Sequence, residues 1–199
     1  MKKTTSSLFA ILLFFMIYSC KKSDNNGNPV SSTTNGFNFK NLFYPTELSG
    51  IIKMNGTYTL VFYSRSMSFD TANHLWKGTG NGVAFGDLLC DKPDNGYPTG
   101  DFYASDSSQN GFFTDVSSII KYNFDVDTGM EKACSNGHLH IVRNGSQFQI
   151  SYSLVNTDST TETGKFTGPL PDISNWFNYS LLTNRRFKFG DGEQRTEDR

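Results

Sequence analysis

The sequence predicts an all-β protein, either a single antiparallel β-sandwich or a flattened, lipocalin-like barrel. Aromatic residues, which favour strands, make up 15% of the chain, and apolar and polar residues alternate in several short runs. Glycine is frequent and proline is sparse, as expected for strands joined by tight turns. Outside the first twenty residues, no stretch keeps the 3.6-residue apolar period of an amphipathic helix.

The first twenty residues have the organisation of a lipoprotein signal peptide. Two lysines precede an apolar run at residues 8–18, which is too short to span a bilayer. The run ends in Ile-Tyr-Ser-Cys at residues 17–20. This ending resembles the bacterial lipobox: an aliphatic residue, any residue, a small residue and then cysteine. We expect residues 1–19 to be a lipoprotein signal peptide and Cys20 to carry the lipid.

The residues around Cys20 also predict where the protein resides. Lys21 and Lys22 follow the cysteine, so an aspartate that would retain a lipoprotein at the inner membrane is absent there. The expected location is the cell envelope, with the protein anchored in the outer membrane through Cys20, in either the periplasmic or the surface-facing leaflet. The alternative is a secreted protein cleaved near Ser19, in which Cys20 is a free thiol exposed to oxidation.

The remaining chain divides into three parts. Residues 20–36 comprise the lipidated cysteine and a polar segment with one aliphatic side chain, and we expect a flexible tether with a reach of about 20–25 Å. Residues 37–182 are expected to form one all-β domain. Nine of the last fifteen residues are charged, so residues 183–199 are predicted to be a disordered, charged tail.

Four strands are predicted in the first two thirds of the domain. The first, residues 57–65, alternates cleanly, with Tyr58, Leu60 and Phe62 on one face. Gly82 and Gly86 mark kinks at the second strand, and a Tyr-Pro-Thr-Gly turn precedes the third. The fourth alternates weakly, as a half-buried strand does. These strands cover residues 57–65, 83–90, 101–104 and 119–126.

A hairpin is the clearest unit of the sequence. Residues 138–142 and 147–154 flank Asn144-Gly145, the pair that supplies two positive φ angles to a type I′ turn. After the turn, every second residue from Phe148 to Leu154 is apolar, so one face should be buried and the other exposed. A shorter third strand is predicted at residues 163–168.

This hairpin region also has a resemblance to known proteins. The residues Asn-Gly-His-Leu-His-Ile-Val (136–142), Gly-Ser-Gln-Phe-Gln-Ile (145–150) and Gly-Lys-Phe-Thr-Gly-Pro-Leu (164–170) form one frame, to which Tyr-Pro-Thr-Gly-Asp-Phe (97–102) adds a further segment. The frame resembles an uncharacterised family of Bacteroidetes outer-membrane and surface lipoproteins. The resemblance covers residues 55–170 and implies an all-β domain exposed on the cell envelope. It implies no functional residues.

Two small sets of residues were considered for special chemistry. Cys90 and Cys134 are the cysteines besides Cys20, and in an oxidising envelope either a disulfide between them or two free thiols is compatible with the sequence. His138 and His140 project from the same face of a strand and are candidate metal ligands, but two exposed polar residues explain them better, and no metal or other cofactor is predicted.

The sequence contains no catalytic signature, so a non-catalytic function is favoured over an enzymatic one. The formal net charge of −1 argues against nucleic acid as a partner. We expect a glycan- or ligand-binding module, with an envelope protein as another candidate partner, and Trp76, Tyr97 and Tyr103 as candidate ligand-binding residues. The alternatives are a lipocalin-like carrier of a small apolar ligand and, less favoured, a hydrolase acting on a polysaccharide. The aromatic residues considered for stacking on a sugar ring are Tyr63, Trp76, Tyr97, Tyr103, Phe112 and Phe113.

Overall fold

β-strands make up most of the chain that the structure, a computed structural model, describes, namely residues 34–105 and 109–176. These residues belong to one compact unit and contain twelve strands and one 3-10 turn at Ser174–Trp176, which confirms the predicted all-β class. The strands are β1 (Gly36–Phe39), β2 (Leu42–Pro45), β3 (Leu48–Met54), β4 (Thr57–Tyr63), β5 (Met67–Asp70), β6 (Leu75–Leu89), β7 (Gly100–Ala104), β8 (Phe112–Phe113), β9 (Asp115–Asn123), β10 (Thr128–Asn144), β11 (Gln147–Asn156) and β12 (Thr161–Gly168).

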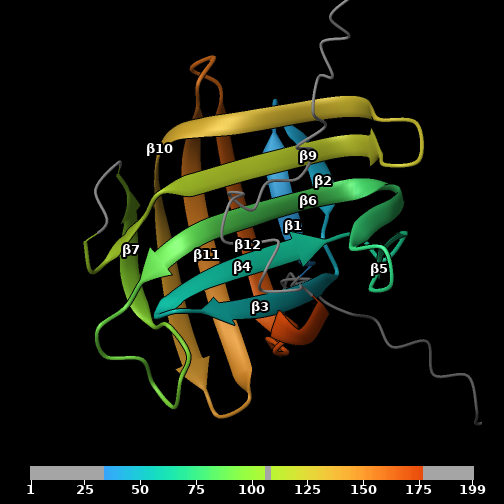
Figure 1. The fold of residues 1–199 in the computed structure, drawn as a ribbon. Coiled ribbons are helices and arrows are strands. Elements are labelled where there is room, and N and C mark those ends of the chain that lie inside the picture. The colour runs from blue at the N-terminus through green and yellow to red at the C-terminus, as the bar shows by residue number, and fades with distance from the viewer. Residues whose placement is uncertain (1–33, 106–108, 177–199) are drawn as a thin grey trace, which may run out of the picture. The chain divides into compact units, whose positions relative to one another are not determined.

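Nine of the strands form one continuous, strongly curled sheet. Their order is β2-β1-β12-β11-β10-β9-β6-β4-β3, and every neighbouring pair on this path is antiparallel. Off the path, β5 pairs with β6, β7 pairs with β10, and the short β8 pairs with β7 in parallel. The curl makes the sheet a half-barrel whose two ends lie in different layers (Figure 1).

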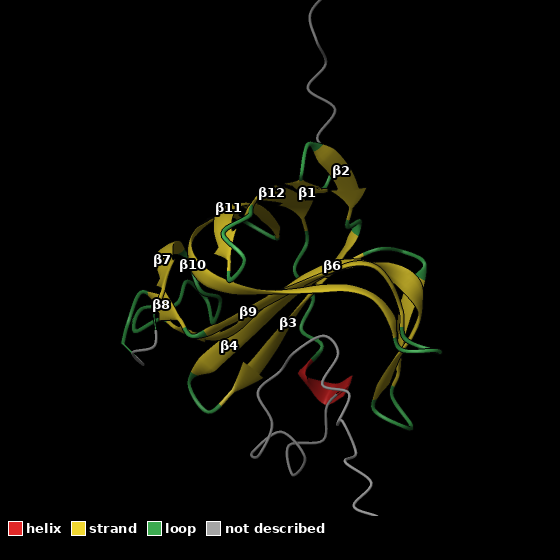
Figure 2. Cartoon of the chain, turned by 90° about the horizontal axis from the view of Figure 1, so that it is seen from above, coloured by secondary structure: helices red, strands yellow, loops and turns green. Residues whose placement is uncertain are grey.

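The long strand β10 joins the two layers. Its first part, residues 128–133, pairs with β9, whereas residues 134–144 pair with β11 and, in part, with β7. The register shifts between Cys134 and Asn136, and an irregularity of this kind bends a strand. As a result, β11, β12 and β1 run steeply behind β9, β6, β4 and β3 in Figure 1, and the same two layers are visible from above in Figure 2.

The main hydrophobic core lies between these two layers. Phe62 of β4 packs on Phe166 of β12 with ring centroids 5.1 Å apart. Phe85 of β6 packs edge-on against Tyr152 of β11, also at 5.1 Å. Large side chains from both layers therefore interdigitate and fill the curl, as they do in a β-sandwich.

A second apolar cluster covers the outer face of the β3, β4, β6 and β9 layer. Ile52, Val61 and Ile119 project to this side and are at most 1% exposed. Ile173 packs on them, and its backbone N–H donates to the carbonyl of Ile51, which holds the chain after β12 against β3. This outer face is therefore part of the structural core, unlike the outer face of the other layer.

Most of the predicted strands are present. The predicted strands at residues 57–65, 101–104 and 163–168 correspond to β4, β7 and β12, and the predicted hairpin corresponds to the end of β10 and to β11. The strand at residues 83–90 is only the second half of β6. The strand at residues 119–126 is β9, which starts and ends earlier. β1, β2, β3, β5 and β8 were not predicted. Four of them have four residues or fewer, and β3 contains a glycine and lacks clean alternation.

The predicted hairpin turn is corrected by one position. Asn144 pairs directly with Gln147, so the two turn residues are Gly145 and Ser146. Of the residues at this turn, only Gly145 has a positive φ, 63°. Positive φ at the first turn residue alone is the pattern of a type II′ turn, so the type I′ prediction, which required it at Asn144 as well, is wrong.

Several predictions concern residues outside the described part of the chain. The signal peptide at residues 1–19, the lipid-bearing Cys20, most of the tether and the tail at residues 183–199 all lie there. Among the described residues, none forms a helix with the length and apolar character that crossing a bilayer requires.

Candidate ligand-binding face

The outer surface of β7, β10, β11, β12, β1 and β2 is mostly polar, with exposed Val142 and Val155 among its polar side chains, and we call it the polar face. Alternation along each strand produces it. In β11, every second residue from Phe148 to Asn156 is buried, and the residues between them, such as Ser151 and Ser153, are exposed. In β12, Phe166 points inward, whereas Thr163 and Lys165 are exposed. The same sequence pattern that fills the core therefore leaves this surface polar.

One row of side chains crosses the polar face at right angles to the strands. Antiparallel residues that pair directly project to the same side of a sheet, so the members of such a row share one surface. The row ends in two exposed aromatic residues, Tyr103 (50% exposed) and Phe43 (44% exposed). Five strand spacings of about 4.8 Å separate them, or about 24 Å along the sheet. In order, the row is Tyr103, His138, Ser153, Thr163, Asn38 and Phe43.

A second row lies beside the first and carries the charged groups. Direct pairing links Asp101, His140, Ser151 and Lys165 in that order. His138 Nε2 from the first row and His140 Nδ1 each lie 2.8 Å from Oδ1 of Asp101. These two hydrogen bonds lower the pKa of the Asp101 carboxyl below its usual value, and the bond from His138 has the larger effect. The carboxylate thus orients both imidazole rings on the surface.

Tyr103 is the one of the three predicted ligand-binding residues that is suited to stacking. Its ring lies 4.8 Å from the His138 ring, at an angle of 30° between the planes. The imidazole therefore supports the phenol ring, and half of the Tyr103 surface stays exposed. A supported, exposed aromatic ring is a surface on which the apolar face of a sugar can lie.

The other two predicted residues, Trp76 and Tyr97, are mainly structural. Trp76 packs edge-on against Tyr63 and Phe69 in the second apolar cluster, far from β7 in the sheet order. One side of Tyr97 packs on Phe148, and Lys53 Nζ lies 4.0 Å from the centroid of the same ring. Of the further aromatic residues considered, Tyr63 and Phe113 are buried in the core.

A hollow of about 370 Å³ adjoins the Phe43 end of the first row. It lies between the β1–β2 turn and the β11–β12 loop, and its lining includes Asn38 and Thr163 of that row. Every lining residue is polar, and Lys40 is the charged one among them. The lining residues are Asn38, Lys40, Asn41, Ser159, Thr160, Thr161 and Thr163.

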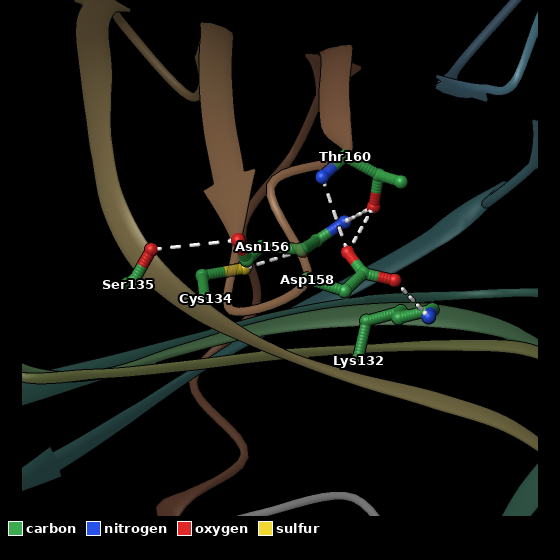
Figure 3. A network of polar contacts seen from close by, with 6 residues as sticks. All are labelled: Lys132, Cys134, Ser135, Asn156, Asp158 and Thr160. Carbon is green, nitrogen blue, oxygen red and sulfur yellow. Dashed lines mark hydrogen bonds and ion pairs between the residues drawn. The ribbon is translucent and has the colours of Figure 1, made fainter.

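A polar network holds the β11–β12 loop beside this hollow (Figure 3). Lys132 Nζ lies 2.6 Å from Oδ2 of Asp158. This contact is the largest of the causes that lower the pKa of the Asp158 carboxyl far below its usual value. Asp158 also accepts a hydrogen bond from the hydroxyl of Thr160, which in turn accepts one from the amide of Asn156 at 3.1 Å. The loop is thus cross-linked to β10 and to itself.

The two cysteines of the described chain are free thiols in the structure. The Cys134 thiol donates to Oδ1 of Asn156 at 3.2 Å, as Figure 3 shows, and its pKa is raised to about 12, first by burial and then by the negative charges of Glu162 and Asp115. Cys90 follows β6 and lines a surface hollow beside Asp101. No disulfide joins Cys90 to Cys134 in this structure.

A buried acid lies behind the polar face. Glu162 of β12 points into the core, is 1% exposed, and has no hydrogen-bond partner for either carboxyl oxygen among the described residues. Burial raises the pKa of the Glu162 carboxyl to about 7. The Ser118 hydroxyl faces the carboxyl group and partly offsets this rise in pKa. No hydrogen bond of normal geometry joins the two groups. Burial, and then the Glu162 charge, also raises the pKa of the neighbouring Tyr152 phenol. Glu162 thus affects the fold without reaching the polar face.

No group of three or more histidine, cysteine, aspartate or glutamate side chains in residues 34–105 and 109–176 is arranged to hold a metal ion. His138 and His140 do project from the same face of β10, as predicted from their spacing. Asp101, which the sequence did not single out, binds both rings instead, because β7 and β10 pair across 37 residues of chain.

Asn38, Phe43, Ser153 and Thr163 were also missed by sequence reasoning. Each belongs to an ordinary alternating strand, and only the strand order brings them into one row. The chain matches no known family model, no curated protein and no solved structure, so its function rests on the geometry of its own residues.

Proposed function

We propose that this protein is a non-catalytic glycan-binding module of the cell envelope whose ligand lies across the polar face. The observation that carries the proposal is the first row, in which two exposed aromatic rings enclose imidazole, hydroxyl and amide groups. Sugars present apolar ring faces and many hydroxyls. Aromatic rings match the former, and side chains that both donate and accept hydrogen bonds match the latter.

The form of the face favours an extended ligand over a small one. The middle of the first row consists of short side chains on neighbouring strands, namely Ser153, Thr163 and Asn38. These side chains rise less far above the sheet than the aromatic rings at the two ends of the row. The aromatic rings at its ends are separated by about 24 Å of sheet. A linear oligosaccharide that crosses the strands would contact both rings and the groups between them.

The proposed place of action rests on the N-terminal sequence. A lipid on Cys20 and a flexible segment that ends before Asn35, which hydrogen-bonds to Thr167, would moor the domain to the outer membrane while leaving it able to reach a polymer. Such a protein would hold a glycan close to the cell.

The geometry supports the alternatives less well. Asp101 is the one carboxylate in the two rows, whereas most glycoside hydrolases use a pair of carboxylates that flank the scissile bond. A carrier of an apolar ligand would need an apolar space inside the curl, but Phe62, Phe85 and Phe166 pack against one another there.

A glycan array tests the proposal. The protein without its signal peptide and with Cys20→Ser, which removes the lipid, is applied to immobilised oligosaccharides. We expect binding to extended glycans that weakens at least about tenfold in Tyr103→Ala, the loss of one stacked ring. Leu75→Ala is the matched control, because Leu75 is an exposed apolar residue of β6, outside the polar face. Binding to no glycan, or equal loss in both variants, would overturn the proposal.

A further inference from the structure

The two ends of the polar face differ in charge. At the β7 end, Asp101 is the acid, and it is bound by the imidazoles of His138 and His140. At the opposite end, Lys165 of the second row and Lys40 beside the hollow are exposed cations. Three strand spacings, about 14 Å along the sheet, separate Lys165 from Asp101, so the carboxylate does not neutralise it.

No acid of the described chain pairs with these two lysines. Asp158, in the β11–β12 loop beside the hollow, is bound to Lys132. Glu162 comes between exposed residues of β12 but points into the core. Lys40 Nζ lies 5.3 Å from the centroid of the Phe39 ring, which leaves its charge available to a further partner. The β1–β2 end of the polar face therefore carries two positive charges without an acidic partner among the described residues, together with hydroxyl and amide groups.

The β1–β2 turn sets the position of Lys40 beside the hollow. Lys40 and Asn41 have φ values of 50° and 63°, the left-handed conformation that both residues of a type I′ turn require. Glycine, asparagine and aspartate are the residues favoured there, so a lysine at the first position is strained. The tight turn projects a cation at the rim of the hollow.

From these contacts we infer that the glycan is acidic, and that its carboxylate or sulfate groups bind at the end of the polar face formed by Lys40 and Lys165. This inference rests on the proposed function and adds the ligand class and the orientation. Sugar hydroxyls would bind to the threonine, serine and asparagine side chains of the hollow. Lys165 pairs with Gly36, about 13 Å along the chain from Lys40, so each ammonium group would bind an anionic group of its own. The uncharged part of the chain would extend toward Tyr103.

The test uses pairs of glycans that differ only in charge. Oligosaccharides of uronic acids are compared with their methyl esters, and sulfated glycans with their desulfated forms, using the Cys20→Ser protein. We expect the acidic form to bind at least about tenfold more tightly, with the difference reduced at high salt because exposed charges are screened. Lys165→Gln and Lys40→Asn should each remove most of that preference.

Lys121→Asn is the matched control for Lys40→Asn. Lys121 is also exposed and also has a φ of 50°, but it lies on β9 in the other layer. Asparagine tolerates positive φ, so both variants should fold at least as stably as the parent chain, and only Lys40→Asn should lose affinity for acidic glycans.

The outcomes separate the two proposals. Equal affinity for the acidic and neutral forms would overturn the acidic ligand and leave glycan binding standing. A preference for acidic glycans that persists in Lys40→Asn and Lys165→Gln would overturn the assignment to this end of the face. No binding to any glycan would overturn the proposed function itself. A dimer in sedimentation that Lys165→Gln dissociates would show that a second copy covers the face and would overturn both.

Discussion

Gly164 lies directly against the phenol of Tyr152: a Cβ at position 164 would be 2.1 Å from Cζ of that ring and 2.3 Å from its hydroxyl oxygen. The two residues pair across β12 and β11, and Tyr152 in turn packs edge-on against Phe85 of the opposite layer. The absence of a side chain at residue 164 is therefore what lets the largest side chain of β11 fill the centre of the core.

Gly164→Ala should destabilise the protein by about 1–3 kcal/mol, because the added methyl group displaces a buried ring that packs against Phe85. Chemical denaturation of the Cys20→Ser protein measures the change. Thr163→Ala, at the exposed neighbouring position, is the control and should change the free energy of unfolding by less than about 0.5 kcal/mol. Equal effects in the two variants would contradict the packing described here.

Glu162 should make stability depend on pH. The folded protein keeps the Glu162 proton up to about pH 7, whereas the unfolded chain loses it near 4.5, so the folded state binds more protons between these values. Stability should therefore fall as pH rises from about 4.5 to 7, by about 3 kcal/mol in all, and should not fall further above that range on account of this group.

Glu162→Gln removes the titration and should be more stable than the parent chain at pH 8 by up to about the same amount, since a neutral amide is buried in place of a charge. Denaturation curves of both proteins from pH 4 to pH 8 measure the effect. A difference between them that is independent of pH would show that the carboxyl is not buried as described.

The two cysteines should react as thiols of different accessibility. Cys134 is mostly buried with a pKa raised to about 12, whereas Cys90 lines a surface hollow. A thiol reagent at pH 8 should modify Cys90 first and Cys134 only slowly, because the thiolate is the reactive form. In denaturant without reductant, the Cys20→Ser protein should titrate two thiols. A count of zero would show that a disulfide joins them.

Trp76→Ala should affect stability rather than ligand binding. The Trp76 ring packs against Tyr63 at 5.1 Å and Phe69 at 5.3 Å on the outer face of the other layer. We expect a loss of roughly 2–4 kcal/mol in the free energy of unfolding. Glycan affinity, measured well below the melting temperature, should stay unchanged. Weaker glycan binding by the folded Trp76→Ala variant would show that Trp76 belongs to the ligand-binding site after all.

Cys20 should be required for membrane attachment. In cells given radiolabelled palmitate, the wild-type protein should incorporate label and fractionate with membranes, because two or more acyl chains hold a protein stably. Cys20→Ala should lose both properties, while Ser19→Ala, which keeps a small residue before the cysteine, should retain them. Palmitate labelling of Cys20→Ala would contradict the lipoprotein assignment.

By itself, the sequence determined the all-β class and the strands that alternate most cleanly. β11 is the best case, because Phe148, Ile150 and Leu154 alternate with polar residues, and alternation depends only on neighbours along the chain. It also determined that His138 and His140 share a face. The turn beside them was predicted one residue out of position, since Asn-Gly and Gly-Ser both favour tight turns and cross-strand pairing chooses between them.

Only the tertiary structure decided which residues meet. Tyr103 and Asn38 lie in one row because β7, β10, β11, β12 and β1 are neighbours, and Asp101 binds two histidines 37 and 39 residues away for the same reason. The sequence made Trp76 and Tyr103 equal candidates for ligand binding. In the structure the Trp76 ring packs in the second apolar cluster, whereas the Tyr103 ring is half exposed. Strand order depends on how the apolar faces of all strands can be buried at the same time. The sequence of a single strand does not show this, because it depends on the other strands.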